Sequence, residues 1–193
     1  MSVEIHNLIT SAKTVGMLQH DEEIISLSTF VAALQPKRVM EIGSWKGGVF
    51  KILSSIAKEL AISVDLDAYG DLPGTMEERN AMFRSWGEHI HPLVGDSHSM
   101  GTYRAVHSLV GNQQLDFLMI DGDHSYEGVK QDYFMYSPFV RSGGWIAFHD
   151  INDSQFHRER NCYVFNFGNE LQGNKVVYTL NKQWGGIGLI QMP

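Results

Sequence analysis

The chain of 193 residues has a single cysteine, Cys162, which excludes an internal disulfide and a cysteine-rich zinc site. It also lacks any apolar run near the roughly 20 residues that a helix needs to span a bilayer. Its first residues, MSVEIHNLITSAK, lack the uninterrupted apolar core of a signal peptide. We therefore expect a cytoplasmic protein with no membrane partner.

Basic residues are in the minority, with 15 Lys and Arg against 22 Asp and Glu and a net charge of −7. General affinity for nucleic acid depends on neutralising phosphates, so we expect no nucleic-acid partner. The content of 43% hydrophobic and 19% charged residues is typical of a soluble globular protein. The length is that of one domain with a sizeable core.

Strand-like and helix-like stretches alternate along the chain. Two helical stretches come first, the second capped by Asp21 and stopped by Gln35-Pro36. Strands are expected at residues 39–42, 61–65, 92–94, 116–120, 145–148, 175–180 and 187–190, with helical periodicity between most of them and a glycine turn at 142–144. This alternation predicts one α/β domain over residues 1–193, with N-terminal helices in 1–36 and a mostly parallel sheet in 37–193.

Each of the first five expected strands ends at or beside a carboxylate. Ligands bind beyond the carboxyl ends of the strands in open α/β sheets. A single acidic strand end is typical of turn or cap chemistry, but five in succession predict a site. The residues are Glu41, Asp65, Asp96, Asp121 and Asp150.

The glycine turn after the first strand excludes two common nucleotide sites. A dinucleotide fingerprint starting at Gly43 needs glycine where Trp45 stands, and the indole would block the pyrophosphate. No G-x-x-x-x-G-K-[ST] phosphate loop occurs either. A nicotinamide dehydrogenase is therefore the least favoured function. The pattern present is Glu41-x-Gly43-x-x-x-Gly47.

This pattern resembles the first motif of class I S-adenosylmethionine-dependent methyltransferases. The stretches 118–132 (LMIDGDHSYEGVKQD) and 143–150 (GGWIAFHD) closely resemble the subfamily of macrocin O-methyltransferase-like and cephalosporin-hydroxylase-like proteins. The resemblance covers about residues 18–192. It implies a three-layer Rossmann-like fold whose seven-stranded sheet has six parallel strands and an antiparallel last strand.

The resemblance also implies which residues hold S-adenosylmethionine. The acid at the end of the second strand, Asp65, would accept the ribose hydroxyls, with Asp67 as its rival on the same side. The third motif would place Asp96 and Ser97 beside adenine. The full expected cofactor set is Glu41, Gly43, Ser44, Gly47, Asp65, Asp96, Ser97 and Asp121.

In metal-dependent relatives, the ends of the fourth and fifth strands hold a divalent cation. By position, its ligands here would be Asp121, Asp150 and His149, with Mg²⁺ or Mn²⁺ as candidate ions. His149 departs from the usual acid or amide. Strand alternation points it away from Asp150 unless the chain turns sharply, so it ranks as the weakest ligand. The alternative is a partly buried base hydrogen-bonded to a neighbouring loop.

His124 and Asp123 are the candidates for the general base, because they follow the fourth strand and histidine titrates near neutrality. Alternatively, Asp-Gly-Asp-His is a tight turn that caps the next helix.

A basic cluster of His157, Arg158 and Arg160 is either a lid over an acceptor or a solvated loop.

The favoured function is O-methylation of a hydroxyl on a small molecule or saccharide. Whether a divalent metal assists the reaction is left open by the sequence. Two alternatives stay open. One is a metal-dependent oxygenase that uses Asp121, His149 and Asp150 around Fe²⁺. The other is an S-adenosylmethionine-binding protein without transfer activity. The sequence does not indicate the acceptor or the oligomeric state.

Overall fold

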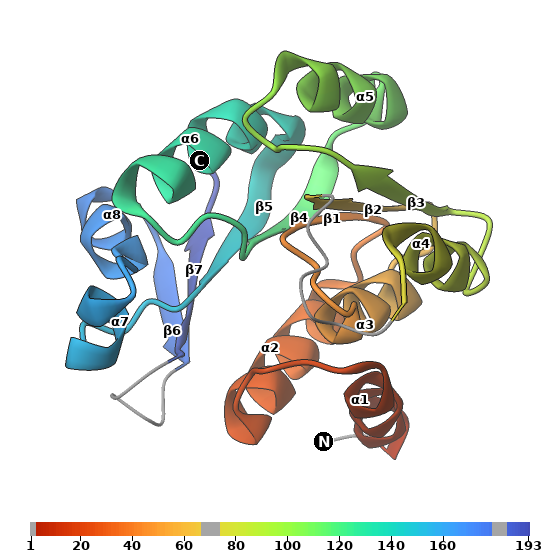
Figure 1. The fold of residues 1–193 in the computed structure, drawn as a ribbon, viewed down its shortest axis with the longest axis horizontal. Coiled ribbons are helices and arrows are strands. Elements are labelled where there is room, and N and C mark those ends of the chain that lie inside the picture. The colour runs from red at the N-terminus through yellow and green to blue at the C-terminus, as the bar shows by residue number, and fades with distance from the viewer. Residues whose placement is uncertain (1–2, 67–73, 179–184) are drawn as a thin grey trace.

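The computed structural model describes residues 3–66, 74–178 and 185–193, and in them helices and strands alternate as the sequence predicts (Figure 1). No helix in these ranges has the length and apolar character needed to cross a membrane. The elements in chain order are α1 (Val3–Val15), α2 (Asp21–Leu34), β1 (Arg38–Ile42), α3 (Gly48–Ile56), β2 (Leu60–Asp65), α4 (Met76–Arg84), β3 (Ile90–Val94), α5 (Met100–Val110), β4 (Leu115–Ile120), α6 (Tyr126–Tyr136), the 3₁₀ turn η1 (Ser137–Phe139), β5 (Val140–His149), α7 (Gln155–Glu159), α8 (Val164–Glu170), β6 (Lys175–Tyr178) and β7 (Ile187–Gln191).

The strands form one seven-stranded sheet in the order β3-β2-β1-β4-β5-β7-β6. The pairs from β3 to β5 are parallel, whereas β7 runs antiparallel to both β5 and β6. The predicted mostly parallel sheet with an antiparallel last strand is therefore confirmed. The strand order reverses between β1 and β4, and such a switch point is where open α/β sheets bind ligands.

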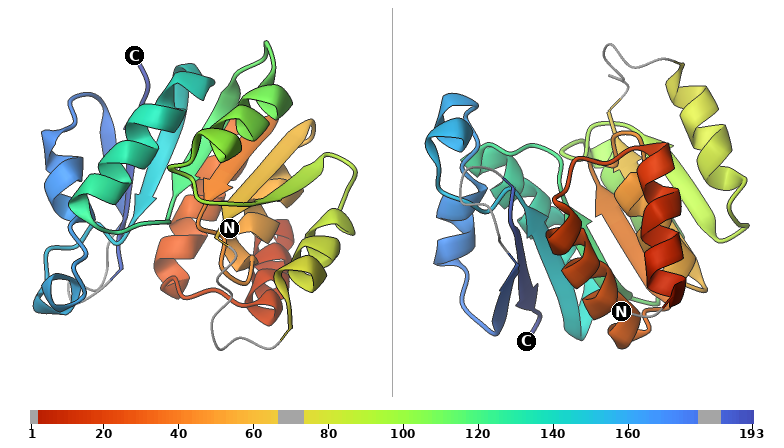
Figure 2. Two further views of the ribbon diagram at one scale, coloured as in Figure 1. Left: turned by 45° about the horizontal axis from the view of Figure 1, so that its top comes forward. Right: turned by 90° about the horizontal axis from the view of Figure 1, so that it is seen from below.

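Two apolar layers pack against the two faces of the sheet (Figure 2). Alternation along β2 shows the division, because Ile62 packs in one layer and Ala61 in the other. One face is covered by α5, α6 and α8, and the other by α1, α2, α3 and α4. Because the sheet is buried on both faces, its open surface for chemistry is the edge where the strands end.

Two local expectations are wrong. Asp21 is not the N-cap of α2: His20 holds that position, and Asp21 opens the helix while pairing with Lys13 at 2.7 Å. Residues 142–144 are not a turn but part of β5, which accommodates the extra residues as a bulge opposite β4.

Candidate active site

Two glycines shape the turn that joins β1 to α3. Both have positive φ, 81° at Gly43 and 99° at Gly47. A Cβ at Gly43 would lie 2.0 Å from the backbone oxygen of Asp121, and one at Gly47 would lie 2.2 Å from the ring of Phe83. The turn therefore requires glycine for its conformation and for its close approach to β4 and α4.

Two adjoining cavities open at the ends of β1, β2 and β4. The first has a volume of about 540 Å³ and is lined by Asp65, the 95–98 loop and residues 121–123. The second, about 370 Å³, lies between residues 16–19 and the ends of β4 and β5. Both are lined by Gly43, Trp45, Asp121 and Gly122. An extended ligand can therefore run from one cavity into the other across the glycine turn.

Asp65, the predicted ribose acceptor, lies in the first cavity and already accepts three hydrogen bonds. Its Oδ2 accepts from the backbone N of Trp45 and from Arg79 Nη1, both at 2.7 Å, and its Oδ1 accepts from the backbone N of Leu66 at 2.9 Å. A carboxylate has about four acceptor sites, so Oδ1 retains room for one further donor. Its rival Asp67 lies outside the described residues.

Glu41, the penultimate residue of β1, lies at the wall of the second cavity and is 1% exposed. Its Oε2 has no hydrogen-bond partner among the described residues. Burial raises the pKa of Glu41 well above its ordinary value, with Asp121 and Asp65 adding to the effect. A buried carboxyl group with a free oxygen suits a cationic group of a ligand.

Asp96 and Ser97, the residues expected beside adenine, follow β3 and line the first cavity with His98. Asp96 Oδ1 accepts from the backbone N of His98 at 2.8 Å, which holds the loop in a tight turn. The buried hydroxyl of Ser44 contacts that of Ser63 at 2.8 Å, so a hydrogen bond holds the turn after β1 against β2.

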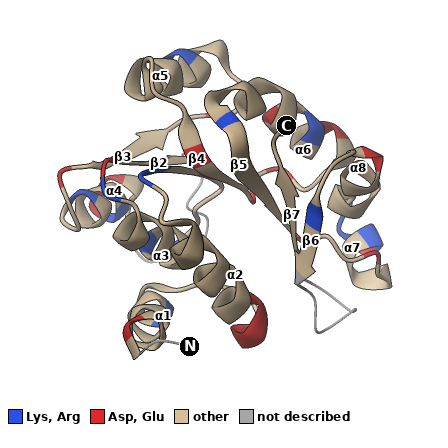
Figure 3. Ribbon diagram, turned by 180° about the vertical axis from the view of Figure 1, so that it is seen from behind, with Lys and Arg blue, Asp and Glu red and all other residues tan. Residues whose placement is uncertain are grey.

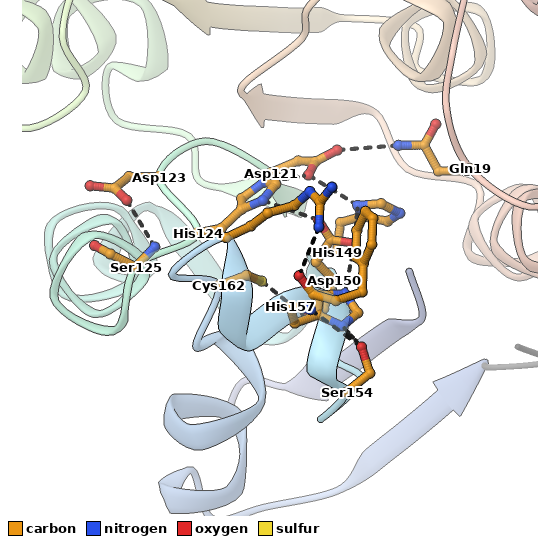
Figure 4. Close-up of polar contacts among 12 residues, drawn as sticks. Gln19, Asp121, Asp123, His124, Ser125, His149, Asp150, Ser154, His157 and Cys162 are labelled. Atoms are coloured by element: carbon orange, nitrogen blue, oxygen red, sulfur yellow. Dashed lines mark hydrogen bonds and ion pairs between the residues drawn. The ribbon is translucent and has the colours of Figure 1, made fainter. Parts of the chain in front are cut away.

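Asp121, His124, His149 and Asp150 form one polar cluster at the wall of the second cavity (Figure 4). His124 lies between the two acids, with Nε2 3.1 Å from Asp121 Oδ1 and Nδ1 3.0 Å from Asp150 Oδ2. His149 Nδ1 lies 3.2 Å from Asp121 Oδ1 and 3.4 Å from Asp150 Oδ1. The fourth and fifth strand ends therefore meet, as expected for neighbours in the sheet.

A sharp backbone turn brings His149 and Asp150 to the same side. Asp150 has a φ of 58°, in the left-handed region. Simple alternation, which ranked His149 as the weakest ligand, does not apply at this position because the strand ends there. His149 is 4% exposed, and its Nε2 has no hydrogen bond among the described residues.

The acids and histidines of this cluster shift one another's pKa values. Burial alone would raise the pKa of Asp121 and of Asp150, but the two histidines lower both. Burial alone would lower the pKa of His149, yet Asp121 and Asp150 raise it to about 10. The same two acids raise the pKa of His124 against the effect of burial.

The donor set fits a divalent cation. One donor atom from each of Asp121, His149 and Asp150 lies within 4.8 Å of the other two. Two carboxylates and an imidazole suit Mn²⁺ or Fe²⁺, and the carboxylates alone suit Mg²⁺. A second group, His124, Asp150 and Cys162, meets the same distance criterion.

The two candidate bases lie apart. His124 belongs to the cluster in the second cavity, whereas Asp123 is exposed and lines the first. Asp123 Oδ1 accepts from the backbone N of Ser125, which caps α6 through its own hydroxyl (Figure 4). Asp123 therefore belongs to the tight turn before α6, whereas His124 lies among the polar side chains of the second cavity.

Sequence reasoning missed one side chain of this site, Gln19, and left two alternatives open for another, His157. Gln19, between α1 and α2, donates from Nε2 to Asp121 Oδ2 at 3.2 Å and lines the second cavity. His157 is not in a solvated loop: it is 2% exposed and its Nε2 lies 3.4 Å from Asp150 Oδ1. Arg158 and Arg160 of the same predicted cluster are exposed.

The strand order, the antiparallel β7 and the glycine turn between two cavities define a class I S-adenosylmethionine-dependent methyltransferase fold. Residues 40–151, more than half of the chain, match the family model of the methyltransferase domain. The chain belongs to this family.

Part of the chain is similar to a viral protein. An uncharacterized protein of Acanthamoeba polyphaga mimivirus is 26% identical over 115 residues, which are 59% of this chain and 51% of that protein. The chain thus spans about half the length of this relative.

Solved methyltransferases share the fold across the whole chain. The O-methyltransferase TomG from Streptomyces achromogenes, in complex with S-adenosylmethionine and involved in tomaymycin synthesis, has a TM-score of 0.68 at 11% identity, covering 100% of this chain and 91% of that one. An O-methyltransferase from Bacillus cereus, in complex with S-adenosylhomocysteine, has a TM-score of 0.62 at 13% identity over 99% and 91%. The N-methyltransferase NodS from Bradyrhizobium japonicum, also bound to S-adenosylhomocysteine, has a TM-score of 0.59 at 13% identity over 97% and 99%. At these identities the likeness concerns the fold.

Proposed function

We propose that this methyltransferase transfers the methyl group of S-adenosylmethionine to a hydroxyl of a small molecule or saccharide, assisted by a divalent cation. The observation that carries the proposal is the position of His124, held between Asp121 and Asp150 in a cavity that adjoins the glycine turn. A base beside two oxygen ligands suits a hydroxyl acceptor, which must lose a proton during transfer.

The two cavities divide the cofactor between them. The first would hold the nucleoside, with Asp65 accepting a ribose hydroxyl and the Asp96-Ser97 loop beside the base. The second would hold the methionine part, whose ammonium suits the buried Oε2 of Glu41. Bound S-adenosylmethionine supplies an electrophilic methyl group on a sulfonium. Gly43 and Gly47 permit the turn that lets a ligand lie across both cavities.

The chain's own groups would organise the acceptor. Asp121 and Asp150, with His149, would hold the cation, which supplies a Lewis acid to the acceptor oxygen. Both ring nitrogens of His124 contact acids that hold the ring protonated, so it could act as a base only when a cation neutralises Asp121 or Asp150. In that state its free nitrogen would take the hydroxyl proton, a role that contributes about 10²–10⁴-fold in rate. Gln19 orients Asp121 through its hydrogen bond from Nε2.

A transfer assay with methyl-labelled S-adenosylmethionine and a panel of hydroxylated acceptors, with Mg²⁺ or Mn²⁺ present, tests the proposal. We expect His124→Gln to lower the transfer rate at least about 100-fold, because the base is lost. Asp123→Asn is the matched control: it changes the adjacent exposed acid and should stay within a few-fold of the unchanged protein.

Other outcomes would overturn the proposal. An equal loss of transfer rate in both variants would show that His124 is not the base. Oxygen consumption dependent on Fe²⁺ and an organic substrate would favour the oxygenase alternative. Cofactor binding without transfer to any acceptor in the panel would favour a binding protein.

A further inference from the structure

A buried acid outside the proposed chemistry lies behind the first cavity. Asp132, on α6, is 0% exposed. Neither of its carboxylate oxygens receives a well-formed hydrogen bond from the described part of the chain. Burial raises the pKa of Asp132 to about 6. An ionised carboxylate in such a place is costly unless a positive charge lies beside it.

The group beside it is His98, which lines the first cavity. Its Nε2 lies 3.2 Å from Asp132 Oδ1 and donates to the backbone oxygen of Gly128 at 3.2 Å. Both neighbours are acceptors, so this nitrogen carries a hydrogen. The other nitrogen, Nδ1, lies 4.0 Å from Asp96 Oδ1. The ring is thus held from α6 while its side chain remains 22% exposed.

Asp132 also lies close to the opposite wall of the same cavity. A Cβ on Gly122 would lie 3.3 Å from Asp132 Oδ2. One turn further along α6, the Tyr136 hydroxyl donates to the backbone oxygen of Ser97 at 2.6 Å. Helix α6 therefore makes polar contacts to the 95–98 loop from Gly128, Asp132 and Tyr136, and Asp132 also reaches toward the end of β4.

We propose that Asp132 is a positioning residue for cofactor binding: it holds His98, and through it the 95–98 loop, against the nucleoside in the first cavity. The inference rests on the proposed function, because it takes the nucleoside of S-adenosylmethionine as the occupant of that cavity. Gly128 and Tyr136 also hold the loop against α6, but Asp132 is the one of these three contacts that carries a carboxyl group.

The pair responds to pH in a defined direction. The groups that face Asp132 are His98 and Ser97, which lower its pKa, and Asp96 and Asp123, which raise it. With a pKa of about 6, Asp132 is ionised at pH 8, where its Oδ1 is the stronger acceptor for the hydrogen on His98 Nε2, and it is largely neutral at pH 5. The contribution of Asp132 to cofactor affinity should therefore be present at pH 8 and lost as the pH falls through 6.

Calorimetric titration with S-adenosylhomocysteine at pH 5, 6, 7 and 8 tests this inference. We expect Asp132→Asn to raise the dissociation constant about tenfold at pH 8 and less than about twofold at pH 5. At each pH, the dissociation constant of the variant is divided by that of the unchanged protein. This ratio cancels the effect of groups that titrate in both proteins, such as Glu41.

A second variant separates positioning from general damage to the fold. His98→Ala alters a partly exposed side chain, and the double variant should bind no more weakly than His98→Ala alone, because Asp132 acts through His98. Additive losses, or a ratio for Asp132→Asn that is the same at every pH, would overturn the inference. If the unchanged protein does not bind S-adenosylhomocysteine, the proposed function fails; if it binds and the ratio is one throughout, only the role of Asp132 fails.

Discussion

Asp65 serves both the proposed cofactor and the fold. Its Oδ2 neutralises Arg79, whose side chain is 1% exposed, and accepts from the backbone of Trp45 in the glycine turn. Only part of the carboxylate remains for ribose. A variant at this position therefore affects binding and stability together, and the two effects have to be measured separately.

We expect Asp65→Ala to weaken S-adenosylhomocysteine binding by about 1.5–3 kcal/mol through loss of a charge-assisted hydrogen bond, and to lower the melting temperature because Arg79 loses its partner. Calorimetry below the melting temperature measures the first effect and thermal unfolding the second. The control is Asp116→Ala, which removes an ion pair of the same length, 2.7 Å, but with the half-exposed Arg141, at the opposite end of β4 and away from both cavities. Unchanged affinity in Asp65→Ala would move the ribose contact to Asp67.

Asp150 is the test residue for the cation, because it contacts His124, His149 and His157. We expect Asp150→Asn to abolish transfer or its dependence on added Mg²⁺ or Mn²⁺ while leaving cofactor binding intact, since a neutral amide is a weaker ligand. Transfer assays with metal and with excess chelator make the measurement. Full turnover of the unchanged protein in chelator would show that no cation takes part.

Local sequence could point to the acids at the strand ends but not to every side chain around them. Gln19 lies 102 residues from Asp121 and follows a helix rather than a strand, so no spacing or motif indicates it. His157 belongs to a polar stretch that looks like a surface loop, yet α7 turns it inward. These contacts depend on how distant elements pack.

At the scale of elements, the β1–α3 turn and its contact with β4 determine the shape of both cavities. Strand boundaries with clear turns beyond them could be predicted, as at the ends of β1 and β4. The start of β5 could not, because Ser142-Gly143-Gly144 has the composition of a turn. Backbone pairing of Gly143 and Gly144 with Met192 keeps this stretch in the sheet.

We expect Gly43→Ala to destabilise the protein by about 1–3 kcal/mol more than Gly111→Ala. Both glycines have positive φ, but a Cβ at Gly111 would meet nothing within 4 Å, whereas one at Gly43 would meet the Asp121 backbone at 2.0 Å. Gly111→Ala therefore measures the conformational cost alone. Urea unfolding compares the two, and equal losses would show that the turn relaxes without disturbing β4.

At the scale of the whole molecule, the alternation of strands and helices predicts the mostly parallel sheet covered on both faces, whereas the antiparallel last strand was implied by the family resemblance. Figure 3 shows residues of both charge signs distributed over the elements seen from this side. That the 193 residues unfold as one domain stays a prediction.

The most direct test of the account is calorimetric titration of the whole chain with S-adenosylhomocysteine and, separately, with NADH, each with and without Mg²⁺. Trp45, which lines both cavities, stands where a dinucleotide site needs glycine. We predict one S-adenosylhomocysteine bound per chain with a dissociation constant in the micromolar range, about −8 kcal/mol, and no binding of NADH. Saturable micromolar binding of NADH, or no binding of S-adenosylhomocysteine under either condition, would contradict the account.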